Sequence, residues 1–296
     1  MPRMHRPLLL WIFAISAIAQ IKPDALLNLP VPPADQRLTY GTDPLQFGEL
    51  RLPKTKGPHA VAILVHGGCW MDRLPGAEPR ITTFELLRPL ASALTEDGLA
   101  TWNIEYRRVG NPGGGWPNTY LDLSQGTDFL RTIATRFNLD LKRVVVAGHS
   151  SGGQFALWIA ARSTLSASSP IYSKDPLRMK AAINIDGPSD IGFFQPQETK
   201  TCGAPVITTL MGGKPSEVPE RYRDGSIHAS TVLAIPQKIV IGGLLKGFPE
   251  KYVEESKAQG NDVAAVPLEG SNHFDMLDPA TSWGKTLRDL ILSSAR

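Results

Sequence analysis

Residues 144–153, with the sequence VVVAGHSSGG, constrain the fold of this chain more than any other stretch. The run of valines and alanine suits a central strand that is covered on both faces, and the alanine-rich residues 154–161 predict a helix packed closely on the sheet. Ser150 lies between the two, on a turn so sharp that Gly148 and Gly152 are needed to let strand and helix pass without Cβ clashes. We therefore expect its hydroxyl to stand clear of the sheet, beside the positive end of the helix dipole.

Further apolar runs, each followed by a stretch with helical spacing, repeat this order along the chain. Strands are expected over residues 60–65, 100–106, 142–147, 180–186, 237–241 and 262–268, and an alternating stretch over residues 45–52 indicates an antiparallel edge strand. This pattern is typical of the α/β class, with a doubly wound, mostly parallel, eight-stranded sheet. We expect one domain over residues 40–296, an irregular leader over residues 20–39, and a small lid over about residues 187–235, where periodicity is weak.

Residues 1–19 have the features of a secretory signal peptide. Arg3 and Arg6 precede an apolar run that is too short to span a membrane, and the small residues up to Ala19 suit a signal peptidase. An uncleaved membrane anchor is the alternative. Cleavage removes two arginines and no acids, so the formal net charge falls from +3 to +1, which favours neither nucleic acid nor an anionic surface as a partner. We expect an exported protein, periplasmic or extracellular, with no stable membrane span after cleavage.

The G-x-S-x-G pattern around Ser150, with its strand and helix, resembles the nucleophile turn of the α/β-hydrolases, and the resemblance covers nearly all of the chain after about residue 40. The apolar strand before residue 66 leads into the sequence HGGCW, which resembles the H-G-G-x-W loop of esterases related to hormone-sensitive lipase and kynurenine formamidase. Carried over from that resemblance, the oxyanion hole consists of the N–H groups of Gly68, Cys69 and Ser151.

A serine nucleophile needs a base, and the base needs a carboxylate that orients it. His273 follows the last strand in a loop that resembles the family's G-x-x-H-F pattern, so it is the predicted base; His228 is expected to cap or pack in the lid. The family acid usually follows the strand over residues 237–241, but Leu245 stands at that position. Leucine cannot orient an imidazole, so the carboxylate must come from elsewhere or the triad is damaged.

Asp186 is the predicted replacement, because it ends the strand over residues 180–186, next to the strand of the nucleophile. Platelet-activating-factor acetylhydrolases and pancreatic-type lipases, which this arrangement resembles, place their acid there. Asp190 is an alternative, although it matches an aspartate that more often caps a lid helix. Glu250 is the other alternative.

Three further side chains are expected to line the substrate pocket: Trp70, Trp116 and His149. Trp116 lies in a glycine-rich loop and is costly to leave in water. Cys69 and Cys202 are the two cysteines, and both fall in loops expected at the same end of the sheet. An exported protein meets an oxidising compartment, so we predict a disulfide between them, with two separate buried thiols as the alternative.

The sequence thus predicts a secreted serine hydrolase that cleaves carboxylic esters, with no metal or organic cofactor. Residues 106–153 most resemble bacterial esterases related to feruloyl and acetyl-xylan esterases and the prolyl-oligopeptidase clan. The expected partner is therefore a small-molecule or carbohydrate-linked ester. An amidase or peptidase of the arylformamidase type is an alternative enzyme, and the leucine at position 245 leaves open a catalytically inactive binding module.

Overall fold

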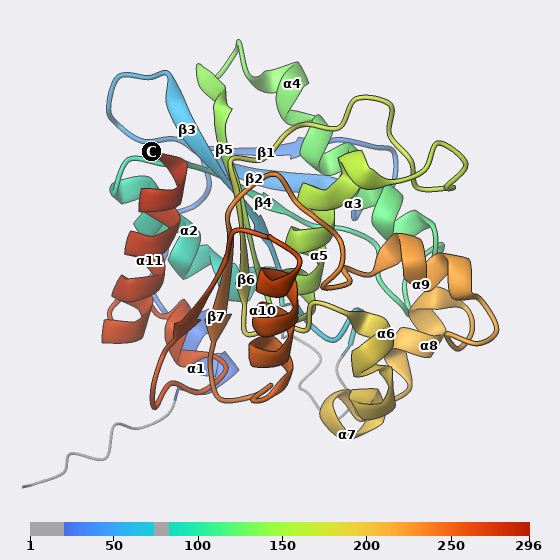
Figure 1. The fold of residues 1–296 in the computed structure, drawn as a ribbon. Helices are drawn as coiled ribbons and strands as arrows, with labels where there is room; N and C mark the ends of the chain where they lie inside the picture. The colour runs from blue at the N-terminus through green and yellow to red at the C-terminus, as the bar shows by residue number, and fades with distance from the viewer. Residues whose placement is uncertain (1–20, 74–82) are drawn as a thin grey trace, which may run out of the picture.

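Eight strands form one sheet in the computed structural model, which describes residues 21–73 and 83–296 (Figure 1). Their order across the described sheet is β1-β2-β4-β3-β5-β6-β7-β8. The strands are β1 (Gln36–Thr39), β2 (Phe47–Arg51), β3 (His59–Val65), β4 (Ala100–Ile104), β5 (Leu139–His149), β6 (Ala181–Ile185), β7 (Gln237–Ile241) and β8 (Val263–Pro267). β2 runs antiparallel to both β1 and β4, and the pairings from β4 to β8 are parallel. The predicted fold class, a doubly wound and mostly parallel α/β sheet, is confirmed.

Both faces of the sheet are covered by helices, which is why most residues of its central strands are apolar. In β3 the side chains of Val61 and Ile63 join one core, and those of Ala62 and Leu64 join the other, because successive residues of a strand point to opposite faces. The first core also contains residues of α3 (Asn118–Asp128), α5 (Ser151–Ala161) and α10 (Phe248–Ala258). The second contains residues of α2 (Arg88–Glu96) and α11 (Ser282–Ala295).

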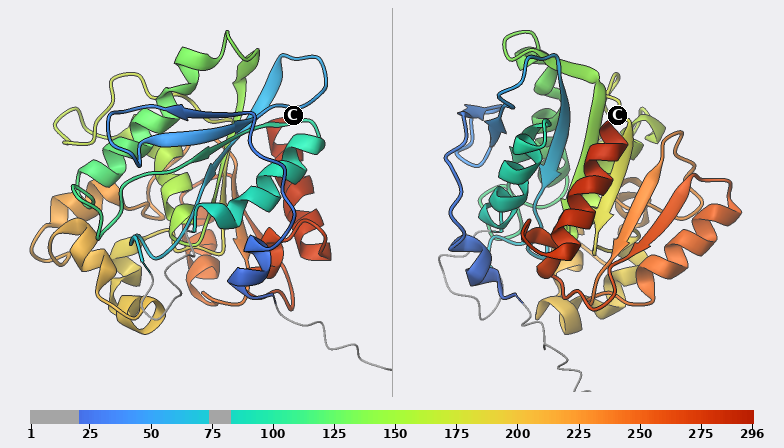
Figure 2. Two further views of the ribbon diagram at one scale, coloured as in Figure 1. Left: turned by 180° about the vertical axis from the view of Figure 1, so that it is seen from behind. Right: turned by 90° about the vertical axis from the view of Figure 1, so that its left-hand side faces the viewer.

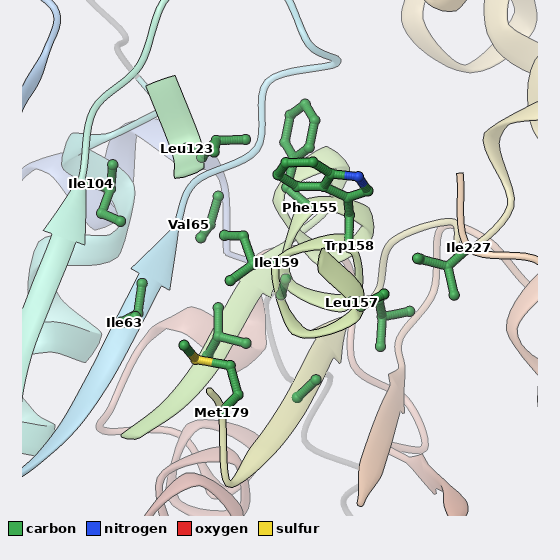
Figure 3. Packing of buried hydrophobic residues seen from close by; sticks show 14 of the residues in the cluster. Ile63, Val65, Ile104, Leu123, Phe155, Leu157, Trp158, Ile159, Met179 and Ile227 are labelled. Carbon is green, nitrogen blue, oxygen red and sulfur yellow. The ribbon is translucent and has the colours of Figure 1, made fainter. Parts of the chain in front are cut away.

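Helix α5 carries the largest part of the first core. Phe155, Leu157, Trp158 and Ile159 cluster around it, and Ile63 of β3 lies in the same cluster (Figure 3). These side chains are almost fully buried, and Trp158 Nε1 donates a hydrogen bond to the carbonyl oxygen of Asp224 at 3.0 Å. Burial of this apolar area holds α5 against the sheet and so fixes the turn that precedes the helix.

The region predicted as a lid, residues 187–235, consists of short helices at the carboxyl end of the parallel strands (Figures 1 and 2). These are α6 (Ile191–Phe194), η3 (Gln195–Gln197), α7 (Glu198–Cys202), α8 (Val206–Met211) and α9 (Pro219–Gly225). The remaining helices are α1 (Pro23–Leu27), η1 (Glu85–Leu87), α4 (Leu130–Ile133), η2 (Arg162–Thr164) and η4 (Asp275–Leu277). Within the described residues, no helix combines the length and the apolar character that crossing a membrane requires.

The leader differs from expectation. Residues 23–27 form α1 and residues 36–39 form β1, whereas the sequence predicted irregular structure over residues 20–39. β1 is short and polar and pairs with β2, so its existence depends on that partner rather than on its own side chains. The predicted signal peptide, residues 1–19, lies outside the described residues.

Candidate active site

Ser150 occupies the strained turn between β5 and α5. Its φ of 58° and ψ of −127° are unusual for a residue other than glycine. The turn depends on two glycines, one before Ser150 and one in the neighbouring HGGCW loop: a Cβ on Gly148 would lie 1.9 Å from the carbonyl oxygen of Gly152, and a Cβ on Gly67 would lie 2.7 Å from Cβ of Ser150. Close approach of three backbone segments therefore presents the serine hydroxyl at the carboxyl end of the sheet.

Asp186 and His273 meet at the same end of the sheet. His273 Nδ1 lies 2.7 Å from Asp186 Oδ2, although 87 residues separate them. The carboxylate is fully buried, and the imidazole is 12% exposed. The bond fixes the neutral tautomer with the proton on Nδ1, which leaves Nε2 as the basic nitrogen. No hydrogen bond joins Ser150 Oγ to His273 within the described residues; such contacts commonly form only when substrate is bound.

The loop after β7 binds the Asp186 carboxylate. Gly242 N donates to Oδ1 at 3.0 Å, and Leu244 N donates to Oδ2 at 3.3 Å. Burial alone raises the pKa of Asp186, but the hydrogen bond and charge of His273, together with the Gly242 N–H, lower that pKa below its ordinary value. Leu245, which stands at the usual family position of the acid, is buried in the apolar core. The loop after β7 therefore carries no acid itself, but its backbone N–H groups stabilise the carboxylate of Asp186.

The alternative acids lie elsewhere. Asp190 accepts a hydrogen bond from Phe193 N at 3.0 Å as the N-cap of α6, and its other oxygen lies 2.6 Å from His228 Nδ1. Glu250 accepts from Gly247 N at the start of α10 and is exposed. Of the three carboxylates considered, the structure brings Asp186 to His273, whereas His228 lies in the region predicted as a lid and pairs with Asp190.

The HGGCW loop runs beside Ser150 in an unusual backbone conformation. Gly68, Cys69 and Trp70 have φ values of 104°, 52° and 58°, in the left-handed region that residues other than glycine rarely adopt. Trp70 N donates to Ser151 Oγ at 3.3 Å, which ties the loop to the first residue of α5. Among the described residues, the N–H groups of Gly68, Cys69 and Ser151 have no hydrogen-bond acceptor. All three residues line the cavity that contains Ser150, so these donors are available to an oxygen bound there.

A buried polar cluster supports this loop from behind. His66 Nε2 lies 3.0 Å from Glu105 Oε1, and Arg108 lies 3.1 Å from the same oxygen. Tyr106 stacks on the imidazole and donates its hydroxyl proton to the carbonyl oxygen of His66 at 2.7 Å. Burial lowers the pKa of His66, which therefore stays neutral. Glu105 holds the first residue of the loop in place, a role that its sequence position after a strand did not reveal.

His149 supports the loop that carries His273. Its Nε2 donates to the carbonyl oxygen of His273 at 2.8 Å, and the centres of the two rings lie 4.3 Å apart. Burial, followed by the nearby charge of His273, lowers the pKa of His149 to about 3. The His149 ring is therefore neutral at ordinary pH. It anchors the loop of His273 without placing a second positive charge beside the base.

A cavity of about 250 Å³ opens next to Ser150. Its lining includes Ser150, His273, His149 and Trp70. Of these, His149 and Trp70 are the residues that the sequence assigned to the substrate pocket. Trp116 does not belong to its lining; it packs edge to face on Tyr120 instead, so its assignment to the pocket is wrong. The remaining lining is largely apolar and comes from several elements: Pro23, Leu86, Pro188, Phe194, Leu244, Leu245 and Phe274.

Cys69 and Cys202 form the predicted disulfide, which closes a sequence separation of 133 residues. Both half-cystines belong to the cavity lining, one from the HGGCW loop and the other from the last residue of α7. The bridge therefore connects the loop beside Ser150 to the region over residues 187–235. Among the described residues, no cluster of three or more histidine, cysteine, aspartate or glutamate side chains has the arrangement of a metal site.

Comparisons with solved structures identify esterases of the same fold. Esterase B from Lactobacillus rhamnosis, inhibited by a tributyrin phosphonate, is 17% identical, with 92% of this chain and 89% of that chain covered and a TM-score of 0.73. A truncated carbohydrate esterase from gut microbiota is also 17% identical, with 90% and 97% covered and a TM-score of 0.69. A butyrate-bound esterase from Thermogutta terrifontis is 17% identical, with 88% and 93% covered and a TM-score of 0.63. No curated protein matches the sequence.

The comparison with protein families gives a more specific result than these distant structures. The BD-FAE family model matches residues 49–231, which is more than half of the chain. The match includes the HGGCW loop, the Ser150 turn and Asp186. The protein accordingly belongs to the BD-FAE family of α/β-hydrolase esterases and is a carboxylic ester hydrolase.

Proposed function

We propose that this esterase is an exported serine hydrolase that works through an acyl-enzyme on Ser150. The observation that carries the proposal is the meeting of three features at one cavity: the strained Ser150 turn, the His273–Asp186 pair at 2.7 Å, and the three N–H groups without acceptors. Together they supply a nucleophile, an oriented base and donors for a developing oxyanion, which is the full requirement for acyl transfer.

In the proposed reaction, Ser150 Oγ attacks the ester carbonyl carbon while His273 Nε2 accepts the hydroxyl proton. The carbonyl oxygen becomes an oxyanion that accepts hydrogen bonds from the N–H groups of Gly68, Cys69 and Ser151. The imidazolium then gives its proton to the alkoxide, the alcohol leaves, and the acyl group stays on Ser150. Water, activated by the same imidazole, completes hydrolysis by releasing the carboxylic acid. Asp186 orients the imidazole and stabilises its charged form.

The cavity favours esters with a small apolar group. A volume of about 250 Å³ lies just below the usual range for ligand pockets, and the lining of the cavity includes Phe194, Leu245 and Phe274. Among the distant neighbours, one has butyrate bound, one is inhibited by a tributyrin phosphonate, and one is named a carbohydrate esterase. We propose a short-chain acyl ester, with a small or carbohydrate alcohol, as the substrate class.

Two observations support export. The basic and then apolar sequence over residues 1–19 has signal-peptide character. The Cys69–Cys202 bridge suits an oxidising compartment.

A fluorophosphonate probe tests the nucleophile. The wild-type protein is expected to react once per chain, with the adduct on the peptide that contains Ser150, and Ser150→Ala is expected to remain unlabelled. The same variant should lose about three or more decades of turnover on short acyl esters, because the oxyanion donors alone provide no covalent path. An N-formyl amide assayed beside the esters separates the amidase alternative. A wild-type protein that neither reacts with the probe nor hydrolyses any ester would be a binding module instead.

A further inference from the structure

The first described segment of the chain reaches the loop of the predicted catalytic base. Ile21 N donates to Asp275 Oδ1 at 2.6 Å, and Asn272 Nδ2 donates to the carbonyl oxygen of Ile21 at 3.0 Å. These contacts join residues about 250 positions apart in the sequence. Figure 1 places α1 at the same end of the sheet as α6 and α7, where the cavity lies. The predicted cleavage after Ala19 leaves this segment in the mature protein.

The two residues that hold Ile21 also shape the turn around His273. Asn272 Oδ1 accepts from Phe274 N at 2.6 Å and from Asp275 N at 2.8 Å. Asp275 Oδ2 accepts in return from Asn272 N at 2.8 Å. His273 lies between these two residues in the sequence, so the hydrogen bonds with Ile21 attach the N-terminal segment to the chain on both sides of the base.

Helix α1 is anchored chiefly by the buried Leu26, with the partly buried Leu27 packed on the same core, and its Pro23 lines the cavity. Leu26 is 1% exposed and lies in the same core cluster as Leu86 and Leu87 of η1. Pro23 lines the cavity together with Leu86 and Phe274. A five-residue helix has almost no stability of its own, so Leu26 and the Ile21 hydrogen bonds hold Pro23 at the cavity.

We propose that residues 21–27 are a specificity-determining part of the active site. Pro23 limits the size of the substrate group on its side of the cavity, and the segment positions the His273 loop through Asn272 and Asp275. The substrate group concerned is an apolar acyl or alcohol moiety of the ester, because Leu86 and Phe274 complete that wall. This inference rests on the proposed serine esterase function of the same cavity.

Substitutions at Pro23 test the wall. Pro23→Trp fills the cavity and Pro23→Gly widens it, and Asp24→Ala, an exposed change in the same helix, is the matched control. Values of kcat/KM are measured over two series of esters, one with growing acyl groups and one with growing alcohols. In at least one series, Pro23→Trp is expected to lower the ratio of the largest to the smallest ester about tenfold or more, and Pro23→Gly to raise it. Unchanged ratios, or a uniform loss on all esters, would overturn the specificity role.

Substitutions at Leu26 test the positioning role. Leu26→Ala is expected to reduce kcat by about 10- to 100-fold, because releasing α1 shifts the base from its working geometry. Leu26→Met, which keeps the apolar volume, should restore most of the activity. Hydrogen exchange of the amides over residues 271–276 provides a readout that needs no substrate: faster exchange in Leu26→Ala is expected, and unchanged exchange refutes the positioning role even if kcat falls.

Wild-type controls distinguish failure of this inference from failure of the proposed function. Fluorophosphonate labelling and hydrolysis of the smallest ester by the wild-type protein establish the nucleophile independently of α1. If the wild-type enzyme is active and the Pro23 variants have the same ester profile, the specificity inference is refuted but the proposed function stands. A wild-type protein without labelling or hydrolysis overturns the proposed function and, with it, the specificity role.

Discussion

Asp186 combines three properties that suit the acid of a triad. Its φ of 50° is one that aspartate tolerates better than most residues, and it aims the carboxylate from the end of β6 toward the neighbouring β7 loop. There the carboxylate accepts two backbone N–H groups and contacts His273. A Cβ on Gly242 would come within 2.8 Å of Asp186 Oδ2, so this close approach also depends on a glycine in the loop.

Asp186→Asn is expected to leave the fold intact and to lower kcat by about four decades at neutral pH. The neutral amide does not stabilise the imidazolium, and an amide N–H that donates to Nδ1 of His273 moves the ring proton to Nε2, which is the wrong tautomer for a base. Steady-state kinetics and circular dichroism measure the two effects. Asp190→Asn is the matched control, because Asp190 contacts His228 and not His273. This variant should retain activity within about tenfold of the wild type. A larger loss in Asp190→Asn than in Asp186→Asn would reassign the acid.

The sequence predicted the site residues that lie in glycine-dependent turns, but not the supporting residues that act through contacts between distant segments. Ser150 and the HGGCW loop were recognisable because their backbone conformations require particular glycines at fixed spacing. The roles of Glu105 and Pro23 were not, because each depends on a tertiary contact that no local pattern encodes. Trp116 was misplaced for a related reason: its cost of exposure can be met by any apolar neighbour, and Tyr120 provides one.

At the scale of elements, strands that face the core on both sides were predicted well. β7 has the predicted bounds, β3 differs from prediction by one residue at its start, and β6 and β8 are each one residue shorter than predicted at both ends. β1 was missed because a short polar edge strand is defined by its partner.

The Asp190–His228 pair links the N-terminus of α6 to the segment after α9. The hydrogen bond with Asp190 raises the pKa of His228 above 6.5, and the same bond lowers the pKa of Asp190 although burial opposes this. The stabilisation from His228 is therefore complete below about pH 6.5 and disappears as the pH rises through its raised pKa. At the acid end, the contribution of Asp190 disappears as the pH falls through its lowered pKa.

His228→Gln is accordingly expected to lower the free energy of unfolding by roughly 0.5–1 kcal/mol near pH 5.5 and by much less near pH 8.5. The magnitude is small because the histidine side chain is 39% exposed and solvent screens the pair. Denaturant unfolding at the two pH values measures it, and a double-mutant cycle with Asp190→Asn isolates the coupling. An equal loss at both pH values would show that packing, rather than charge, holds the segment.

The disulfide makes a larger contribution at the same scale. The double variant Cys69→Ser/Cys202→Ser is expected to lose about 2–4 kcal/mol of unfolding free energy, because the bridge restricts a long loop in the unfolded chain. Turnover should also fall, since the bridge holds the HGGCW loop against α7. Guanidinium unfolding and ester kinetics provide the measurements, with the wild-type protein under reducing conditions as the control. An unchanged unfolding midpoint would contradict this expectation.

For the whole molecule, the position of the N-terminus links export to activity. Export with cleavage after Ala19 is expected to give a mature chain that begins at Gln20 and keeps residues 21–27, which contact the His273 loop. Mass spectrometry of the intact protein from the exported fraction tests this. A chain that retains Met1 and sediments with membranes would favour the anchor alternative instead.

Because the acid follows β6 rather than β7 in this protein, the residues after β7 can be substituted without removing a member of the triad. Leu244 and Leu245 form part of the cavity wall, and the link of Leu244 to Asp186 is a backbone N–H that any residue except proline supplies. Where an esterase of this type carries its acid at the position of Leu245, that position tolerates no substitution. Here a combinatorial library over both leucines can reshape selectivity while the proton-transfer residues stay untouched, so an altered triad becomes a starting point for directed evolution.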